Sequence, residues 1–220
     1  MRISELKDKH KGKTILIVGN GKNVHLTPPE KFKKMPAIAM NTIHLYKGWK
    51  PDYYVAVDKN VLRDYSEGVN KKLKGVPKVL PYPRLQNWHD KDVYWFKQAQ
   101  GRLWSVGEAG LWQDDIGENP ITYANSMHIA IKLAYYLGAK KILIIGMEHE
   151  PREADVHFWG KDAGMSRDQN IKNWLAGYKV LAQELKKRKV TLLNISKETH
   201  VSCDIIEDDD YKKYVKKGDK

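Results

Sequence analysis

The chain has 220 residues, of which 41% are hydrophobic and 30% charged, with a formal net charge of +12 at pH 7. The length fits one domain, the moderate glycine and proline contents exclude a low-complexity chain, and no apolar run approaches the roughly 20 residues of a membrane span. The N-terminal sequence has no apolar signal segment, and Cys203, the one cysteine, cannot form an internal disulfide, so we expect a cytoplasmic protein.

Seven short apolar runs predict β-strands. Continuous apolar runs bounded by turn residues are typical of strands that are buried on both faces of a sheet. Prolines interrupt the fourth run, which predicts only a short strand there. In chain order, the seven runs lie at residues 14–18, 36–41, 52–58, 76–83, 93–98, 140–147 and 190–196.

Two segments with apolar residues at helical spacing predict helices at 122–138 and 168–189. Gly138 fits a helix C-cap, and the last turn of the second helix is basic, which suits the helix dipole. Strands that alternate with helices indicate a layered α/β domain with a mostly parallel sheet.

Two regions fit this pattern less well. Residues 84–119 hold four of the seven tryptophans and are a possible insertion, whose aromatic side chains either pack in the core or frame an acceptor site. Residues 206–220 form a charged C-terminal tail, which we expect to fray, so the predicted domain covers residues 1–205.

The first predicted strand runs into Gly19-Asn20-Gly21. Ligands of open parallel sheets bind beyond the carboxyl ends of the strands, and glycines there let a phosphate or ribose approach backbone N–H groups. The segment matches neither the GxGxxG fingerprint nor a P-loop. A simple tight turn is therefore the alternative.

Polar residues also follow the other strands. For each position alone, a local turn or a helix N-cap is the alternative explanation. Together these strand ends predict a shared crevice. The residues are Asn41, with Thr42 and His44 just beyond it, Asp58 to Asn60, and Gly146, Met147, Glu148 and His149.

Several of these segments resemble one known group of proteins. The segments are VGNGKN at 18–23, Met40-Asn41, PDYYVAVD at 51–58, the long block ANSMHIAIKLAYYLGAKKILIIGMEHE at 124–150, and VHFWGKD at 156–162. The sequence resembles bacterial sialyltransferases that act on lipooligosaccharide, within a wider group that includes flagellin-modifying glycosyltransferase domains and the archaeal 6-hydroxymethyl-dihydropterin pyrophosphokinase. It departs from the group at Lys22 and Asn23, where the family has Pro-Ser, and at Glu148, where it has Asp.

The resemblance implies a single Rossmann-like, three-layer domain that binds a nucleotide. It implies a transferase, most simply a glycosyltransferase with a nucleotide-activated sugar donor, and no required cofactor or protein-bound metal. The glycine turn would lie along the phosphate, the next strand ends would face ribose or sugar, and the helix beginning near Asn125 would point its positive end at the ligand. The expected nucleotide-binding residues are Gly19, Asn20, Gly21, Asn41, Asp58, Asn60, Asn125, Ser126, Gly146, Met147 and Glu148.

His157 is the preferred candidate for the base that deprotonates an acceptor hydroxyl, because a histidine pKa lies near neutrality. It lies in a loop of about 20 residues, a length that is often functional. Phe158 and Trp159 either close over a ring or pack onto the core. His149, nearer the strand end, is the alternative base.

Two other functions stay open. A pyrophosphokinase-like transferase would use ATP with Mg²⁺, held through Asp58 and Glu148. A non-catalytic nucleotide- or nucleic-acid-binding protein would keep the fold and lack the reaction. The basic surface favours anionic partners in every case, although solubility alone also explains it.

Overall fold

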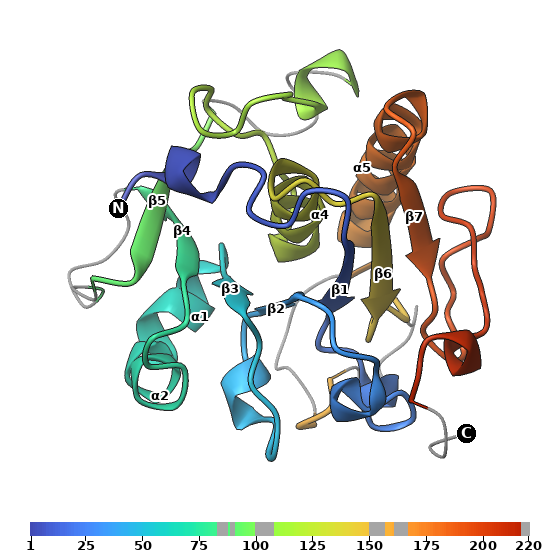
Figure 1. Cartoon of the computed structure of the whole chain (residues 1–220), viewed down its shortest axis with the longest axis horizontal. Helices are drawn as coiled ribbons and strands as arrows, with labels where there is room; N and C mark the ends of the chain where they lie inside the picture. The colour runs from blue at the N-terminus through green and yellow to red at the C-terminus, as the bar shows by residue number, and fades with distance from the viewer. Residues whose placement is uncertain (83–87, 89–90, 100–107, 150–156, 161–166, 217–220) are drawn as a thin grey trace.

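The computed structural model describes residues 1–82, 88, 91–99, 108–149, 157–160 and 167–216 (Figure 1). Its centre is a sheet of seven parallel strands in the order β5-β4-β3-β2-β1-β6-β7, which confirms the α/β prediction. Every predicted strand is present; β1 has the predicted bounds, and each of the other six is shorter than its apolar run. The bounds are β1 (Thr14–Val18), β2 (Ala37–Met40), β3 (Tyr53–Val55), β4 (Lys78–Tyr82), β5 (Val93–Lys97), β6 (Lys141–Ile145) and β7 (Thr191–Asn194).

The strand order changes direction at β1. The chain builds outward from β1 to β5 on one side and then returns to place β6 against the other side of β1, with Thr14 to Val18 opposite Lys141 to Ile145. The carboxyl ends of β1 and β6 therefore flank the topological switch point, where open α/β sheets bind ligands.

Helices cover both faces of the sheet (Figure 1). On one face, α4 (Ser126–Tyr136) and α5 (Arg167–Lys187) pack over Ile15 and Ile17 of β1. On the other face, α1 (Lys59–Asp64) and α2 (Ser66–Lys72) contribute to a second apolar cluster with Leu16 and Val18. Consecutive β1 residues point to opposite faces, and Ile15 to Val18 are all buried, which explains the unbroken apolar run.

Short 3-10 turns complete the connections and take the place of longer helices at several points. They are η1 (Ile3–Leu6), η2 (Lys22–His25), η3 (Pro29–Lys31), η4 (Ile43–Leu45), η5 (Glu108–Leu111) and η6 (Tyr211–Lys213). Within the part of the chain that the structure describes, no helix has both the length and the hydropathy needed to cross a bilayer.

Capping residues fix both ends of α4. Asn125 is its N-cap, with Oδ1 accepting from the His128 N–H at 3.0 Å, so the helix starts four residues after the predicted boundary. At the other end, Gly138 has a φ of +88°, and a Cβ there would lie 2.8 Å from the Lys11 Cα. Both the left-handed backbone and this close approach favour glycine, as predicted.

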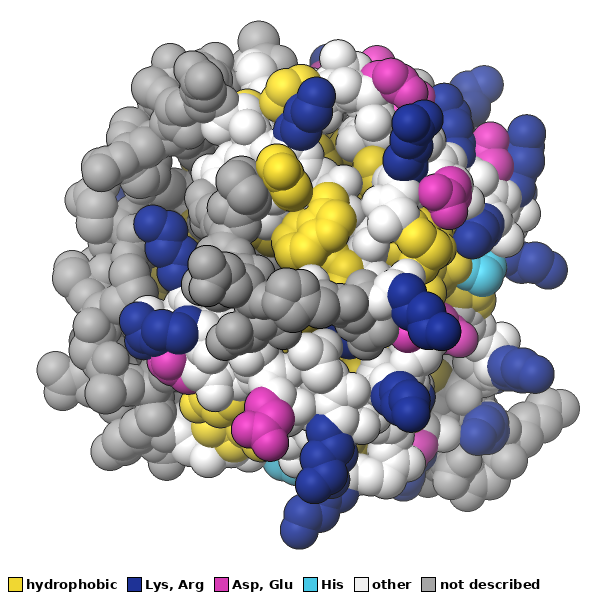
Figure 2. Space-filling model, turned by 90° about the vertical axis from the view of Figure 1, so that its left-hand side faces the viewer, with side chains coloured by type: hydrophobic (Ala, Val, Ile, Leu, Met, Phe, Trp, Pro, Cys, Tyr) yellow, Lys and Arg dark blue, Asp and Glu magenta, His cyan; other side chains and the backbone are white. Residues whose placement is uncertain are grey.

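The segment 84–119 contributes to the sheet and to the core. It contains the edge strand β5, and Trp88 is buried with Nε1–H donating to the Leu62 carbonyl at 2.9 Å. The N-terminal segment lies against β5, where the Met1 ammonium donates to the Val93 carbonyl at 2.9 Å. Figure 2 looks onto this end of the molecule and shows apolar side chains among lysine and arginine side chains. A role in framing an acceptor stays a prediction.

The C-terminal segment does not fray over its described part, so that prediction is wrong. Ile206 and Val215 are buried, Val215 pairs with Phe32, and the Lys216 N–H donates to the Lys31 carbonyl at 3.0 Å. The many charged residues of this segment favour a frayed tail, and its composition does not reveal that Ile206 and Val215 hold it against the domain. Burying an aliphatic side chain typically contributes about 1.5–3 kcal/mol to stability.

Candidate functional site

The loops after β1 and β6 are joined by backbone hydrogen bonds at the switch point. The Gly19 N–H donates to the Ile145 carbonyl at 2.8 Å, and the Gly21 N–H donates to the Gly146 carbonyl at 2.9 Å. A Cβ on Gly19 would lie only 2.2 Å from the Gly146 oxygen. The bare backbone at Gly19 is therefore needed so that the two strand ends can approach each other.

The glycines are therefore needed for a different reason from the phosphate contact that the sequence predicted. Sequence reasoning expected the N–H groups of Gly19 and Gly21 to receive a phosphate, but both already donate to carbonyls of the β6 end. Contact of these residues with a nucleotide stays a prediction, and an anion there needs donors other than these two amides.

Glu148 lies beside the same turn. Its side chain is 3% exposed, and a Cβ on Gly21 would lie 1.5 Å from its Oε2. The carboxylate thus occupies the space that a side chain at position 21 would need. A larger residue at position 21 would therefore clash with Glu148 unless that side chain moved.

The last residue of β7 and residues just after it hold the β6 loop, and sequence reasoning missed them. The Met147 N–H donates to Ser196 Oγ at 3.0 Å, while the Met147 carbonyl accepts from Asn194 Nδ2 at 3.2 Å and from Thr199 Oγ1 at 2.9 Å. The rule that located the other polar strand ends also applies to NIS at 194–196 and would have found Asn194 and Ser196.

Asn41 and Ser126 are brought together as predicted for a common edge. Ser126 Oγ donates to Asn41 Oδ1 at 2.8 Å and accepts from the Val57 N–H at 3.2 Å. Asn41 has a φ of +49°, which asparagine tolerates better than most residues. One hydroxyl therefore links the ends of β2 and β3 to the start of α4.

Asp58 and Asn60 take the alternative that sequence reasoning left open. Asp58 is the N-cap of α1, with Oδ1 accepting from the Asn60 N–H at 2.8 Å and from the Val61 N–H at 3.4 Å. Both Asp58 and Asn60 are exposed. Their position satisfies the start of a helix, and sugar contact stays a prediction.

A partly buried chain of hydrogen bonds joins α4, α5 and the end of β6. Asn125 Nδ2 donates to the Tyr178 hydroxyl at 2.8 Å, and that hydroxyl lies 3.1 Å from His149 Nε2. Sequence reasoning treated Tyr178 as an apolar core residue of its helix, because helical spacing alone does not reveal a buried hydroxyl partner.

The His128 ring lies beside this chain of hydrogen bonds and is itself held by the backbone. Its Nδ1 accepts from the Ala124 N–H at 3.1 Å and its Nε2 lies 3.3 Å from the Trp174 carbonyl, so Nε2 carries the proton. Burial lowers the pKa of His128 to about 3 and the pKa of His149 to about 4. Both rings are therefore neutral at pH 7.

His157 lies against the end of β1. Its Nδ1 is 3.2 Å from the Asn20 carbonyl oxygen, which also accepts from the Phe158 N–H at 3.1 Å. Because a carbonyl can only accept, Nδ1 carries the proton and Nε2 carries the lone pair of the neutral ring. The ring stacks on Trp159 with 4.3 Å between centroids.

Phe158 packs onto the second apolar cluster, with ring centroids 5.8 Å from His25 and 5.6 Å from Tyr46. Of the two predictions for this side chain, packing onto the core is the one that the structure supports. Within the long loop that contains His157, residues 150–156 and 161–166 lie outside the described part of the chain.

Three buried polar atoms near the ends of β1 and β2 have no hydrogen-bond partner among the described residues. They are Asn20 Oδ1, Thr42 Oγ1 and His44 Nδ1, on side chains that are 7%, 2% and 7% exposed. Most buried polar atoms are hydrogen-bonded. These atoms are therefore candidates for ligand contact.

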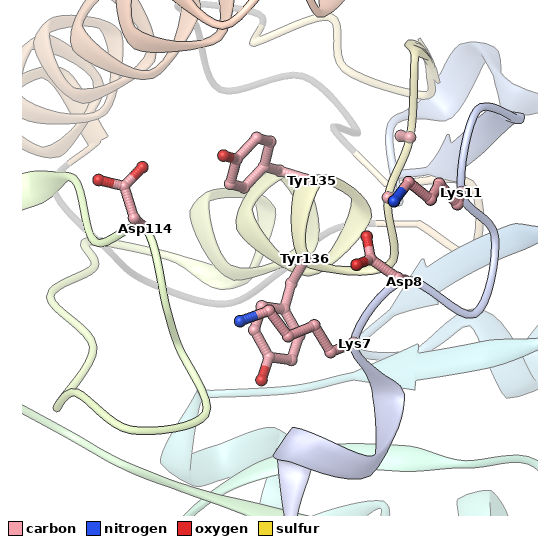
Figure 3. Close-up of a pocket in the computed structure, with 8 residues that line it drawn as sticks. Lys7, Asp8, Lys11, Asp114, Tyr135 and Tyr136 are labelled. Atoms are coloured by element: carbon pink, nitrogen blue, oxygen red, sulfur yellow. The ribbon is translucent and has the colours of Figure 1, made fainter.

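A hollow of about 370 Å³ lies at the opposite, amino edge of the sheet (Figure 3). Its lining includes Lys7, Lys11 and Asp114, and none of the predicted site residues lines it.

Across the described ranges, no group of three or more His, Cys, Asp or Glu side chains is placed to hold a metal ion.

Comparison with known proteins gives a likeness of fold. No protein-family model matches the chain, and no curated protein matches it. The glycosyltransferase MAf from Magnetospirillum magneticum AMB-1 superposes with a TM-score of 0.57 at 13% identity over 99% of this chain, which spans 38% of the length of MAf. The sialyltransferase CST-II, solved with a trisaccharide acceptor and CMP, gives 0.51 at 12% identity over 88% of this chain and 85% of that one. At these identities the chain shares a fold with solved glycosyltransferases.

Proposed function

We propose that the protein is a transferase of the glycosyltransferase type, which moves a sugar from a nucleotide-activated donor to an acceptor hydroxyl. The observation that carries the proposal is the position of His157, whose Nδ1–H is held by the Asn20 carbonyl at the switch point of the sheet. The shared fold with MAf and CST-II supports it, and the CST-II structure holds CMP and a trisaccharide acceptor.

His157 acts as the base in this proposal. Its Nε2 takes the proton of the acceptor hydroxyl while the acceptor oxygen forms a bond to the anomeric carbon of the donor sugar. The bond between that carbon and the phosphate oxygen breaks, and its electron pair stays with the departing nucleotide. The proton on His157 then passes to solvent, which restores the neutral ring.

The nucleotide lies across the β1, β2 and α4 ends in this proposal. Asn20 Oδ1 is an unpartnered acceptor among the described residues, which suits a ribose hydroxyl or the amino group of a base. Asn41, Asn125 and Ser126 surround the start of α4, whose positive end favours an anion. We propose that the reaction needs no divalent cation.

The first experiment is a thermal-shift screen with CMP, UMP, AMP, GMP and ATP, each with EDTA and with Mg²⁺. A selective stabilisation by one pyrimidine mononucleotide in EDTA supports the proposal. A response to ATP only with Mg²⁺ contradicts it and favours the pyrophosphokinase-like function. Indifference to all mononucleotides, with salt-sensitive binding to DNA or RNA, contradicts it in favour of a binding protein.

The second experiment measures transfer or donor hydrolysis with the corresponding nucleotide-sugars. His157→Ala should lower the rate by about 100-fold or more, because general bases typically contribute that much. Nucleotide stabilisation should persist in this variant. The matched control is His10→Gln, at the amino edge, where His10 Nε2 lies 2.9 Å from the Tyr53 hydroxyl. An unchanged rate in His157→Ala would remove His157 from the mechanism.

A further inference from the structure

We propose that His149 is a fixed hydrogen-bond donor for the phosphate that links nucleoside and sugar in the donor substrate, and that Asn125 and Tyr178 position it. This inference rests on the proposed function for the identity of the ligand. It replaces the view of His149 as an alternative base and assigns the two histidines opposite roles.

The direction of the hydrogen bonds follows from Asn125. Its Oδ1 accepts from the His128 N–H at 3.0 Å, so its amide nitrogen is the atom that donates to the Tyr178 oxygen at 2.8 Å. The buried hydroxyl hydrogen of Tyr178 also needs an acceptor, and His149 Nε2, 3.1 Å away, provides it. Since Nε2 accepts, the proton of the neutral ring lies on Nδ1.

Packing holds Tyr178 in this position. Its side chain is fully buried, and its ring meets the His128 ring edge-on, with 4.7 Å between centroids and 89° between planes. The His128 ring fits against α5 because residue 177 is glycine, where a Cβ would lie 2.3 Å from His128 Cε1. Both nitrogens of His128 are bonded to the backbone, so the tyrosine rests on a fixed support.

The His149 ring is also fixed. It lies against Trp174 and Tyr178, with centroid separations of 5.6 Å and 5.4 Å. Its backbone has a φ of +52°, a conformation that non-glycine residues rarely adopt. Burial lowers its pKa to about 4, so the ring stays neutral and keeps its single N–H at pH 7.

The location favours a phosphate ligand. His149 follows the end of β6 at the switch point, and Asn125, which begins the chain of hydrogen bonds, is also the N-cap of the 11-residue helix α4. A helix N-terminus favours an anion. His149 and the start of α4 are thus joined at the edge of the sheet where the proposed phosphate lies.

His157 makes the opposite arrangement. There Nδ1 donates to a carbonyl, which leaves Nε2 as the proton acceptor, whereas at His149 Nε2 accepts and Nδ1 donates. When the anomeric carbon–oxygen bond breaks, negative charge grows on the departing phosphate oxygen. The His149 N–H strengthens its hydrogen bond to that oxygen and keeps its proton throughout, so the protons of the reaction still balance through His157.

A pair of isosteric variants tests the donor. The amide nitrogen of asparagine can take the place of Nδ1, whereas that of glutamine reaches the place of Nε2. We expect His149→Asn to retain kcat/KM within about fivefold, and His149→Gln to lose about 100-fold, as removal of a preorganised donor does. Equal losses in both variants, or a greater loss in His149→Asn, would overturn the inference. Melting curves identify a variant that has not folded.

Tyr178→Phe tests the positioning residue. Without the hydroxyl, the tautomer of His149 is no longer fixed, and we expect an approximately tenfold loss of kcat with little change in KM. A loss in KM alone would contradict positioning of a group that acts on the departing phosphate.

Nitrogen NMR of the histidine-labelled wild-type protein provides a readout that is independent of activity. We expect the Nδ1–H tautomer at His149 at pH 7, and a shift of its Nδ1 signal with CMP but not with cytidine. This pattern without any sugar transfer would overturn the proposed function and leave the phosphate donor standing. The Nε2–H tautomer, or no response to a mononucleotide in an enzyme that transfers sugar, would overturn the inference alone.

Discussion

The two edges of the same sheet are built by different means. At the carboxyl edge, side chains add to the backbone bonds between the β1 and β6 ends: Ser126 bonds to Asn41, and Tyr178 links Asn125 to His149. At the amino edge, the segment before β1 runs along the end of α4, and backbone hydrogen bonds join the two. There the His10 N–H donates to the Leu137 carbonyl at 2.7 Å.

The difference shows where chemistry can reside. The amino edge has a hollow of about 370 Å³, but exposed lysines such as Lys7 and Lys11 line it (Figure 3). The carboxyl edge has neutral histidines whose pKa values burial has lowered and, among the described residues, buried polar atoms without a hydrogen-bond partner. Desolvated polar groups with shifted pKa values are more typical of functional sites than an open hollow with solvated charges.

Substitution of a glycine at each edge gives the largest expected effect. Gly19→Ala places a Cβ 2.2 Å from the Gly146 oxygen, a backbone atom that cannot move alone. We expect a loss of about 3 kcal/mol or more in the free energy of unfolding, from overpacking at the switch point. Urea denaturation measures it.

The amino-edge control is Gly12→Ala. Gly12 has a φ of +74° and nothing within 4 Å of an added Cβ, so only the left-handed backbone contributes, at about 1 kcal/mol. Equal losses in the two variants would show that the contact between the β1 and β6 ends adds nothing to stability.

Low pH should lower the free energy of unfolding, because burial lowers the pKa values of two histidines at the carboxyl edge. The pKa of His128 is lowered to about 3 and that of His149 to about 4. Below about pH 6.5 the unfolded chain binds protons that the folded protein does not, so stability falls as the pH falls from 6.5 toward 4. Each histidine contributes about 1.4 kcal/mol per pH unit in this window.

The measurement is urea unfolding at pH 7, 6 and 5 for the wild type and for His128→Gln. The variant should be less stable at pH 7, because two buried hydrogen bonds change, and its slope against pH should be smaller by about 1.4 kcal/mol per unit. Parallel slopes would show that the pKa of His128 is the same in the folded protein as in the unfolded chain.

Lysines at the amino edge should have the smallest effects. Lys7 pairs with Asp115 at 2.6 Å, but the lysine side chain is 54% exposed, and exposed ion pairs contribute little. Lys7→Ala and Lys11→Ala should each change the free energy of unfolding by less than about 0.5 kcal/mol. Neither should alter stabilisation by the mononucleotide, and loss of that stabilisation in Lys11→Ala would move the nucleotide site to the amino edge.

The sequence predicts the sheet well because its strands are buried on both faces and so appear as unbroken apolar runs. It does not predict α1 and α2, which are six and seven residues long and mostly polar. The strand-end rule located Asn41 and Gly146, since parallel strands deliver their carboxyl ends to one edge. It gave no sign of Tyr178 or His128, because a polar atom that is satisfied inside a helix interface has the same spacing as a core residue.

The hydrogen bonds of Gly19 and Gly21 have a consequence for how substrate preference can change. In a phosphate-binding loop, main-chain N–H groups bind the anion, so a change of side chain leaves that binding in place. Here the amides of these two glycines are occupied by Ile145 and Gly146, so side chains must supply more of the recognition. In the proposed transferase, single substitutions of those side chains would therefore change the preferred donor sugar while the loops keep their backbone structure.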